Sequence, residues 1–154
     1  MTVPATLDRV SLLNRRLALL RAERGELLRE TLLEANGDLA DRATNVEATI
    51  QLGLLDERIA VLEMEIADCR RHRHTEGIVS VGDVVTVDLG DGDETYLVGS
   101  VEEAAAGIDT VTPLSPLGRA IVGASVGTTV TYEPRPGVTL PVAIRAAGEL
   151  LPSV

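Results

Sequence analysis

Two stretches in the first half of the chain repeat apolar residues at alternating spacings of three and four. The first seam consists of Val10, Leu13, Leu17, Leu20, Arg24, Leu27 and Thr31, and the second of Ala48, Leu52, Leu55, Ile59, Leu62, Ile66 and Cys69. This spacing places one residue of every turn on the same helix face and is typical of a coiled-coil seam. The pattern predicts two helices, at residues 8–35 and 42–72.

The two seams are mirror images of each other. When the first is read forwards and the second backwards, the two residue numbers of every pair add up to 79, as for Leu17 and Leu62. The seams therefore match layer for layer if the chain folds back between residues 39 and 40. Two unrelated amphipathic helices would not need mirrored registers, so we expect an antiparallel hairpin. Each arm of about 30 residues would be roughly 45 Å long at ~1.5 Å per residue.

The predicted turn has the sequence Asn36-Gly37-Asp38-Leu39-Ala40-Asp41. Asn-Gly interrupts helices, and Gly37 can adopt the left-handed conformation that ends the first helix. The second helix has two candidate starts: Asp41 as an N-cap, or Thr44 with Glu47 in the spacing of a capping box. Either start leaves Asp38 and Asp41 at the tip of the hairpin.

The second half alternates short apolar runs with turn residues. The pattern predicts strands at residues 81–89, 95–101, 109–111, 128–132 and 139–144, with turns at residues 90–93 and 134–137. One short helix is expected between them, with Ser115 as its N-cap, Pro116 at its first position and Gly123 after its end.

Composition also divides the chain. Residues 1–76 contain 11 Arg and 14 Asp or Glu, whereas residues 77–154 contain 3 Arg, 10 Asp or Glu, eleven of the 14 Gly and six of the seven Pro. We place the boundary near Arg70–Gly77. The predicted fold class is α+β, with an antiparallel two-helix coiled-coil hairpin at residues 1–76 and a small strand-rich domain at residues 77–154.

The overall composition excludes several classes of protein. The 154 residues carry a net charge of -10, and the only aromatic residues are Tyr96 and Tyr132. Such a chain is a poor direct binder of phosphate backbones or unpaired bases, so no sequence-specific nucleic-acid binding is expected. Cys69 alone cannot form an internal disulfide, and the chain has neither a membrane-spanning run of about 18 apolar residues nor a signal peptide. We expect a soluble, cytoplasmic monomer that does not bind membranes.

Asp38 and Asp41 are the first candidate for chemistry. Carboxylate oxygens suit magnesium, but two of them are too few to hold the ion, so the pair would be half of a site completed by a partner. The alternative is structural, with Asp38 completing the turn and Asp41 capping the helix.

Two further clusters have simpler interpretations. The basic run Arg70–His74 favours a helix C-terminus and offers too few ligands for zinc. The acidic run Gly90–Glu94 lacks the later Glu of a calcium loop and is expected to be a solvated hairpin turn. The chain has no catalytic triad, paired-cysteine motif or phosphate loop, so we do not expect an independent enzyme.

Two motifs resemble those of the bacterial Gre transcript-cleavage factors. The tip from Glu34 to Ala43 is similar to the family's Gly-Asp-Leu-x-Glu-Asn-Ala-Glu-Tyr. The run from Ser115 to Gly123, with a downstream Val126-Gly127, is similar to its Ser-Pro-x-Gly-Lys-Ala-Leu-x-Gly followed by Val-Gly-Asp. Both motifs occur in the family's order, about 75 residues apart as in its plan of a hairpin followed by a small domain.

The resemblance implies a transcription factor that binds RNA polymerase. An FKBP-like globular domain would dock at the rim of the secondary channel, and the hairpin would reach toward the active centre. There the tip acids would help to hold a magnesium ion shared with the polymerase, since two-metal chemistry uses one ion for the water and one for the leaving group. No cofactor is expected in isolation. The polymerase-binding residues would be Ser115, Pro116, Leu117, Gly118 and Arg119.

The tip departs from the family pattern. Asp38 is kept, but Asp41 stands in place of a Glu, and Arg42 replaces an Asn and can compete with a metal for the carboxylates. Thr44 and Asn45 replace a Glu and a Tyr. We therefore expect a homologue that occupies the channel and inhibits transcription. The alternative is a Gre-type elongation factor that stimulates intrinsic transcript cleavage in backtracked complexes.

Two other classes of protein remain as alternatives. A peptidyl-prolyl isomerase would share the fold of the second domain, but the absence of Phe and Trp disfavours a proline pocket. A coiled-coil chaperone or scaffold is disfavoured by the polar, acidic tip.

Overall fold

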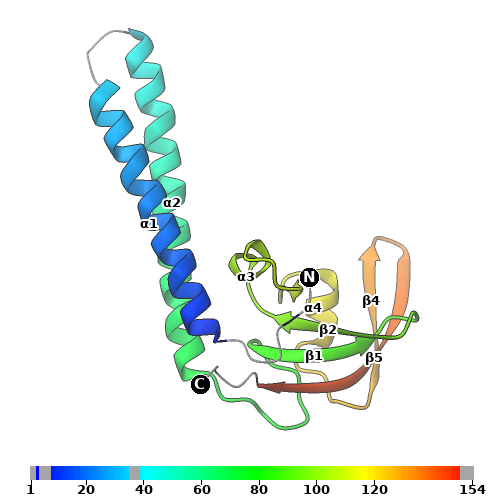
Figure 1. Ribbon diagram of the computed structural model, residues 1–154. Coiled ribbons are helices and arrows are strands. Elements are labelled where there is room, and N and C mark those ends of the chain that lie inside the picture. Colours follow the sequence, from blue (N-terminus) through cyan, green and yellow to red (C-terminus); the bar gives the residue numbers. More distant parts are fainter. Residues whose placement is uncertain (1–2, 4–7, 35–38, 150–154) are drawn as a thin grey trace. The chain divides into compact units, whose positions relative to one another are not determined.

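The computed structural model describes residue 3, residues 8–34 and residues 39–149 of the chain, with the backbone alone for residues 33–34, 39–45 and 149. It contains two long helices, α1 (Arg9–Glu34) and α2 (Leu39–Arg71), followed by a strand-rich region (Figure 1). The helices confirm the prediction from the seam pattern. The chain forms two compact units: a hairpin unit of residues 13–70, and a globular unit of residues 71–154 together with residues 1–12.

The hairpin unit buries the predicted seam. Its buried seam residues are Leu13, Leu17, Leu20, Ala48, Leu55, Leu62 and Ile66. Two ion pairs cross between the helices: Arg24 Nε lies 2.5 Å from Asp56 Oδ1, and Arg21 Nη2 lies 2.8 Å from Glu63 Oε1. Asp56 adjoins Leu55, the predicted layer partner of Arg24, so this pair fits the mirrored register. The individual layers stay a prediction.

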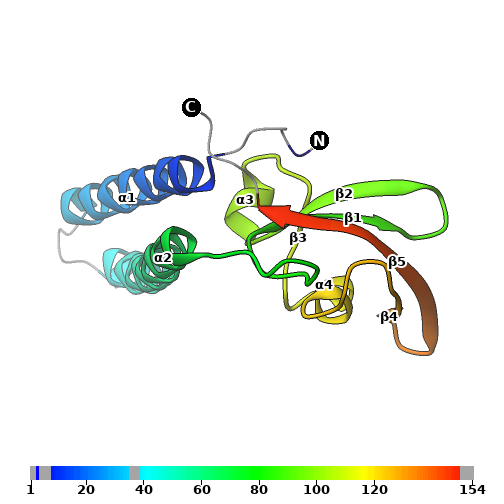
Figure 2. The ribbon, with the colours of Figure 1, turned by 90° about the horizontal axis from the view of Figure 1, so that it is seen from below.

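The globular unit contains one five-stranded sheet in the order β3-β2-β1-β5-β4. The strands are β1 (Asp83–Asp88), β2 (Asp93–Val98), β3 (Thr110–Val111), β4 (Thr129–Arg135) and β5 (Val138–Glu149). All neighbours are antiparallel except β2 and β3. Figure 2 shows how the long β5 bends as it passes along β1 and β4. A helical hairpin followed by a curled sheet confirms the predicted α+β class.

Two short helices complete the globular unit. The predicted helix is present as α4 (Pro116–Ile121). The other, α3 (Val101–Ala105), was not predicted, and the expected strand at residues 95–101 is wrong at its end because β2 stops at Val98. Ser100 ends the extended segment, since its side chain accepts a hydrogen bond from the Glu102 amide and caps the new helix.

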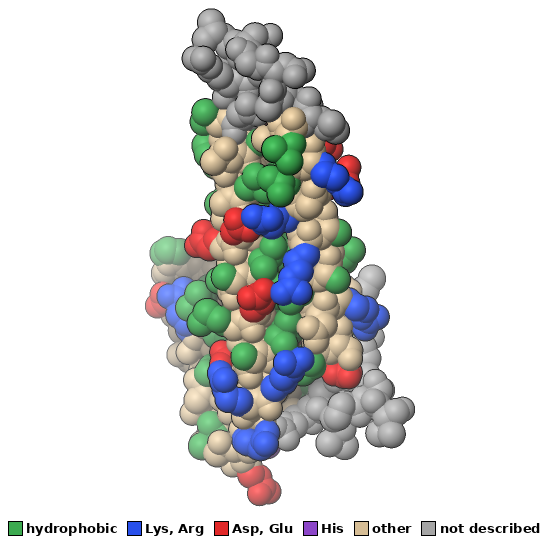
Figure 3. Space-filling model, turned by 90° about the vertical axis from the view of Figure 1, so that its left-hand side faces the viewer, with side chains coloured by type: hydrophobic (Ala, Val, Ile, Leu, Met, Phe, Trp, Pro, Cys, Tyr) green, Lys and Arg blue, Asp and Glu red, His purple; other side chains and the backbone are tan. Residues whose placement is uncertain are grey.

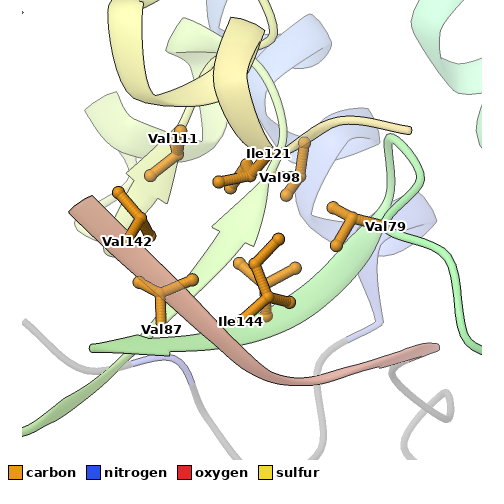
Figure 4. Packing of buried hydrophobic residues seen from close by; sticks show 8 residues of the cluster. Val79, Val87, Val98, Val111, Ile121, Val142 and Ile144 are labelled. Carbon is orange, nitrogen blue, oxygen red and sulfur yellow. The ribbon is translucent and has the colours of Figure 1, made fainter. Parts of the chain in front are cut away.

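The core of the globular unit is aliphatic. Its buried members are Val79, Val85, Val87, Val98, Val111, Ile121, Val142 and Ile144. Figure 4 shows sheet side chains converging on Ile121, which α4 contributes. Branched aliphatic residues fit the pleated surface of a sheet, so the unit closes its core without Phe or Trp.

The domain bounds drawn from composition differ from these compact units. The predicted boundary lies between residues 76 and 77, whereas the globular unit begins at Arg71 and includes the first turn of α1. Side chains on His72 and His74 bond Asp83, which ties the segment after α2 to the sheet. The bounds 1–76 and 77–154 stay a prediction.

Candidate functional site

Ser115 fixes the start of α4. Its hydroxyl oxygen accepts a hydrogen bond from the Gly118 amide at 3.0 Å and donates to the Thr112 carbonyl at 2.7 Å. The Ser115 amide also donates to the Thr112 carbonyl at 3.1 Å. Pro116 occupies the first helical position, where its missing N–H costs nothing. The motif therefore joins the preceding loop to the helix, as the sequence predicted.

Gly118 allows α4 to pack directly on that loop. The residue is buried, and a Cβ atom built on it would lie 1.9 Å from the carbonyl oxygen of Thr112. The obstacle is backbone, which cannot rotate away as a side chain can. The fold therefore requires Gly118, and the face of α4 that carries it is buried against the loop and cannot contact a partner.

The predicted polymerase-binding residues divide into internal and exposed ones. Leu117 is half-buried and packs against the core, whereas Pro116 and Arg119 are exposed. Leu114, which the sequence analysis missed, is 83% exposed in the turn just before the cap. We call Leu114, Pro116 and Arg119 the docking surface.

A local signal could have revealed Leu114. A hydrophobic residue just before an N-cap commonly packs on the fourth residue of the helix. Here that fourth residue is Arg119, so Leu114 has no apolar partner in such a staple. The missing staple partner accounts for the exposure of Leu114.

The predicted tip lies largely outside the described part of the chain. Asp38 is not among the described residues, and for Asp41 and Arg42 the structure describes only the backbone, in the first turn of α2. Because α2 begins at Leu39, Asp41 and Thr44 lie inside the helix, and neither is its N-cap. An Asp in the first helical turn is favourably placed in the field of the helix dipole. The predicted magnesium role stays a prediction.

The basic run after α2 is used for internal contacts. Asp83 is fully buried; its Oδ1 lies 3.3 Å from His72 Nε2, and its Oδ2 lies 2.9 Å from His74 Nδ1. The Ser80 amide donates to the same Oδ2 at 2.9 Å. Across the described residues, no group of three or more His, Cys, Asp or Glu has a geometry that could hold a metal ion.

The acidic turn between β1 and β2 is closed by its own backbone. Asp88 Oδ1 accepts hydrogen bonds from the amides of Gly90 at 2.8 Å and Gly92 at 3.3 Å, and its Oδ2 accepts one from Arg145 at 3.3 Å. The Gly90 amide, followed by Arg145, lowers the pKa of Asp88 below its ordinary value. These contacts are those of a hairpin turn.

The surface of the hairpin mixes charge with apolar side chains. Figure 3 shows hydrophobic, basic and acidic groups interspersed along it. The exposed apolar residues of α2 are Val46, Ile50, Leu54, Val61 and Met64. Among the described helices, none combines the length and apolarity that a bilayer-spanning segment needs.

Comparison with known proteins supports one family. The family described as "Transcription elongation factor, GreA/GreB, C-term" matches residues 74–146. The protein named transcription elongation factor GreA of Chlorobium phaeovibrioides is 33% identical over 121 residues, covering 73% of this chain and 76% of its own. The GreA of Desulfovibrio desulfuricans is 31% identical over 149 residues, covering 90% of both chains.

One solved structure shows a distant likeness. The crystal structure of GreA factor homolog 1 (Gfh1) of Thermus thermophilus is 20% identical, with 96% of this chain and 98% of that chain covered and a TM-score of 0.38. This superposition is too weak to carry an argument about activity.

Proposed function

The chain belongs to the GreA/GreB family of transcription elongation factors, and we propose on that premise that it binds RNA polymerase and regulates transcription from the secondary channel. The observation that carries the proposal is the match across both units: 31% identity over 90% of the chain and of its Desulfovibrio relative. A factor of this kind acts on the catalytic centre of its partner.

The globular unit supplies the affinity in this proposal. The docking surface of Leu114, Pro116 and Arg119 stands on a helix start that Ser115 and Gly118 hold rigidly. Arg is enriched among the residues that contribute most to protein–protein binding, which favours Arg119 as the principal contact of this surface. Ser115, Leu117 and Gly118 act by shaping this surface.

The hairpin supplies the effect on the enzyme. Its narrow rod would carry Asp38 and Asp41 to the active centre, where they would meet a magnesium ion shared with the polymerase. The shortened second acid and the adjacent Arg42 weaken the match to the cleaving pattern. We therefore propose that the bound factor slows nucleotide addition and stimulates little cleavage.

A second function, stimulation of transcript cleavage, is favoured by a specific observation. The relatives that match in sequence carry the name transcription elongation factor GreA. Both acids at the tip are also retained as carboxylates. The two functions share the docking and differ only in what the tip does.

The docking is tested with the full-length protein and purified polymerase. Leu114→Glu and Arg119→Glu should each weaken binding at least tenfold, a loss of about 1.4 kcal/mol or more. The matched control is Val101→Glu, which places the same charge on another exposed apolar residue of the same unit, 64% exposed against 83% for Leu114. Binding that survives both docking variants would assign the contact elsewhere.

The effect is tested on the same complexes. Backtracked elongation complexes with the unmodified protein should show slowed extension and little release of 3′ RNA fragments. Robust cleavage would reject inhibition and establish the second function.

A further inference from the structure

The globular unit contains two fully buried carboxylates, on Asp83 and Glu103. A buried carboxylate is strongly unfavourable unless charged or hydrogen-bonding groups compensate it. Each of the two finds its partner on a segment that leads directly into the helical hairpin. We call these segments the roots: residues 8–12 at the start of α1, and residues 71–74 after the end of α2.

Glu103 binds the first root. Arg9 Nη2 lies 2.6 Å from Glu103 Oε1, and Arg9 Nε donates to Oε2 at 3.2 Å. This two-pronged arrangement combines charge with fixed direction, which a single contact does not. The Arg9 side chain is only 12% exposed. Arg9 is also the first residue of α1, so the pair anchors that helix at its origin.

The backbone makes room for this pair. A Cβ atom on Gly99 would lie 2.2 Å from Glu103 Oε2, so the carboxylate rests against a bare stretch of main chain. The oxygen that meets Gly99 is the one that accepts the hydrogen bond from Arg9 Nε. A residue with any side chain at position 99 would displace it.

Asp83 binds the second root. Its two oxygens meet His72 Nε2 at 3.3 Å and His74 Nδ1 at 2.9 Å, and the Ser80 amide holds it in place. Asp83 is the first residue of β1, in the middle of the sheet. The segment after α2 is therefore fixed to the most central strand.

One glycine joins the two anchors. Gly82 has a φ of +100, and a Cβ atom built there would lie 3.0 Å from Arg9 Nη1 and 3.3 Å from the His72 ring. The side chains of Arg9 and His72 thus both lie close to Gly82. The two roots and the two carboxylates form one cluster, entirely within the globular unit.

We propose that Asp83 and Glu103 are positioning residues that clamp both roots of the hairpin, and so determine how the tip is positioned when the factor is bound to polymerase. The role rests on the proposed function. The clamp makes the roots part of the globular unit, and any bending of the hairpin must then occur in the helices beyond them, near residues 12–13 and 70–71.

The clamp itself is tested in the free full-length protein by amide hydrogen exchange. The Leu12 amide donates to the Asp8 carbonyl at 3.0 Å and reports on the first root, whereas the Ile144 amide donates to Thr128 and reports on the sheet. Arg9→Lys and Glu103→Gln should accelerate exchange at Leu12 by about tenfold or more and leave Ile144 unchanged. Asp56→Asn, which removes an exposed ion pair of the hairpin, is the control and should change neither amide.

Two results would overturn the clamp. Unchanged exchange at Leu12 would mean that the pair does not hold the root. Equal acceleration at Leu12 and Ile144 would mean that the pair stabilises the whole unit. Arg9→Lys keeps the positive charge and loses only the two-pronged hydrogen bonding to Glu103. The comparison of Leu12 with Ile144 can therefore still be made if Glu103→Gln prevents folding.

Positioning is tested on polymerase. For Arg9→Lys and Glu103→Gln, the concentration that gives half of the maximal effect on transcription should stay within about threefold of the value for the unmodified protein. The maximal effect on transcription, measured at saturating factor, should fall about fivefold or more. An unchanged effect at saturation would show a merely structural role and overturn positioning. If the unmodified protein does not bind polymerase at all, the proposed function fails, and the exchange experiment still decides the clamp.

Discussion

Gly118 illustrates how one residue sets the position of α4. Its Cβ position is occupied by the Thr112 carbonyl, so Gly118→Ala must push α4 away from the loop. We expect a loss of about 1–3 kcal/mol in the free energy of unfolding, as for other overpacked sites. Denaturant unfolding of the full chain measures it.

The control for this prediction is the same substitution where space is open. Gly25 lies inside α1 with nothing within 4 Å of its Cβ position. Gly25→Ala should stabilise the protein by about 0.5–1 kcal/mol, since Ala is the better helix former. A Gly118→Ala protein as stable as the unmodified one would contradict the packing argument.

Tyr96 carries a perturbed hydroxyl on β2. The hydroxyl donates to the Glu94 carboxylate, and this bond, with burial and the negative charge of Glu94, raises the pKa of Tyr96 from 10.0 to about 12. A raised pKa stabilises the fold below the unfolded value of about 10, and that contribution is lost as pH rises through the folded value. Phenolate absorbance in a Tyr132→Phe background should therefore show a midpoint near 12.

The comparison variant isolates the cause. Glu94→Gln should move the midpoint back toward the ordinary value, whereas Asp91→Asn in the neighbouring turn should leave it in place. A midpoint unaffected by Glu94→Gln would assign the shift to burial.

Residue-scale features were predictable where the cause is local. The cap on Ser115 and the place of Pro116 follow from neighbouring residues alone. Arg119 at the fourth helical position is a local signal for the exposure of Leu114, whereas the requirement for Gly118 depends on how the loop at residues 112–113 returns over the helix, which no local pattern encodes.

At the scale of elements, the hairpin seam gives a direct test of burial. Leu62 is 1% exposed, whereas Met64, two residues away on α2, is 67% exposed. Leu62→Ala should cost roughly 2–5 kcal/mol, toward the lower end because water reaches both sides of a two-helix seam. Met64→Ala should stay within about 0.5 kcal/mol, as at most surface sites. Thermal and denaturant unfolding compare them, and equal losses would refute the seam.

The mirrored register needs its own measurement. In a Cys69→Ser background, Leu17→Cys with Leu62→Cys should form a disulfide readily, because paired layers bring Cα atoms within about 4.4–6.8 Å. Leu17→Cys with Leu55→Cys, shifted by about two turns, should not. Preferential bridging of the shifted pair would show that the predicted layers are wrong.

Helices and strands were predictable from the sequence where a regular spacing of apolar residues continues over many positions. Both helices and the β4–β5 pair follow from regular spacing or turn residues. The helix α3 was missed because Val101 continues the apolar run of β2, and only the cap on Ser100 ends it. The length of β5 was underestimated because its second half pairs with β1, far away in sequence.

At the scale of the whole molecule, composition located the change of architecture but not the division into units. Gly and Pro mark where strands begin, which is near residue 77. The roots join the globular unit through the polar side chains of Arg9, His72 and His74. Their partners Asp83 and Glu103 come from separate elements, so only the folded chain brings them together.

In the proposed function, the tip decides what the whole molecule does to polymerase. An Arg–carboxylate bond is charge-assisted and can be two-pronged, so Arg42 would compete with magnesium for Asp41. Exposed pairs contribute only ~0–1 kcal/mol, but a channel with little water would strengthen both interactions. Asp41→Glu with Arg42→Asn should therefore raise cleavage of backtracked transcripts on the order of tenfold, since a ligand misplaced by ~1 Å can cost about 100-fold in rate.

The matched variant separates chemistry from bulk. Replacing Asp38 and Asp41 with Asn keeps the size of the tip and removes both charges. If the carboxylates act as ligands, this variant should inhibit less than the unmodified protein at equal occupancy of polymerase, because it no longer engages the metal. Inhibition that survives unchanged would mean that the rod blocks the channel by its volume, and no gain in cleavage from the Glu–Asn variant would then be expected.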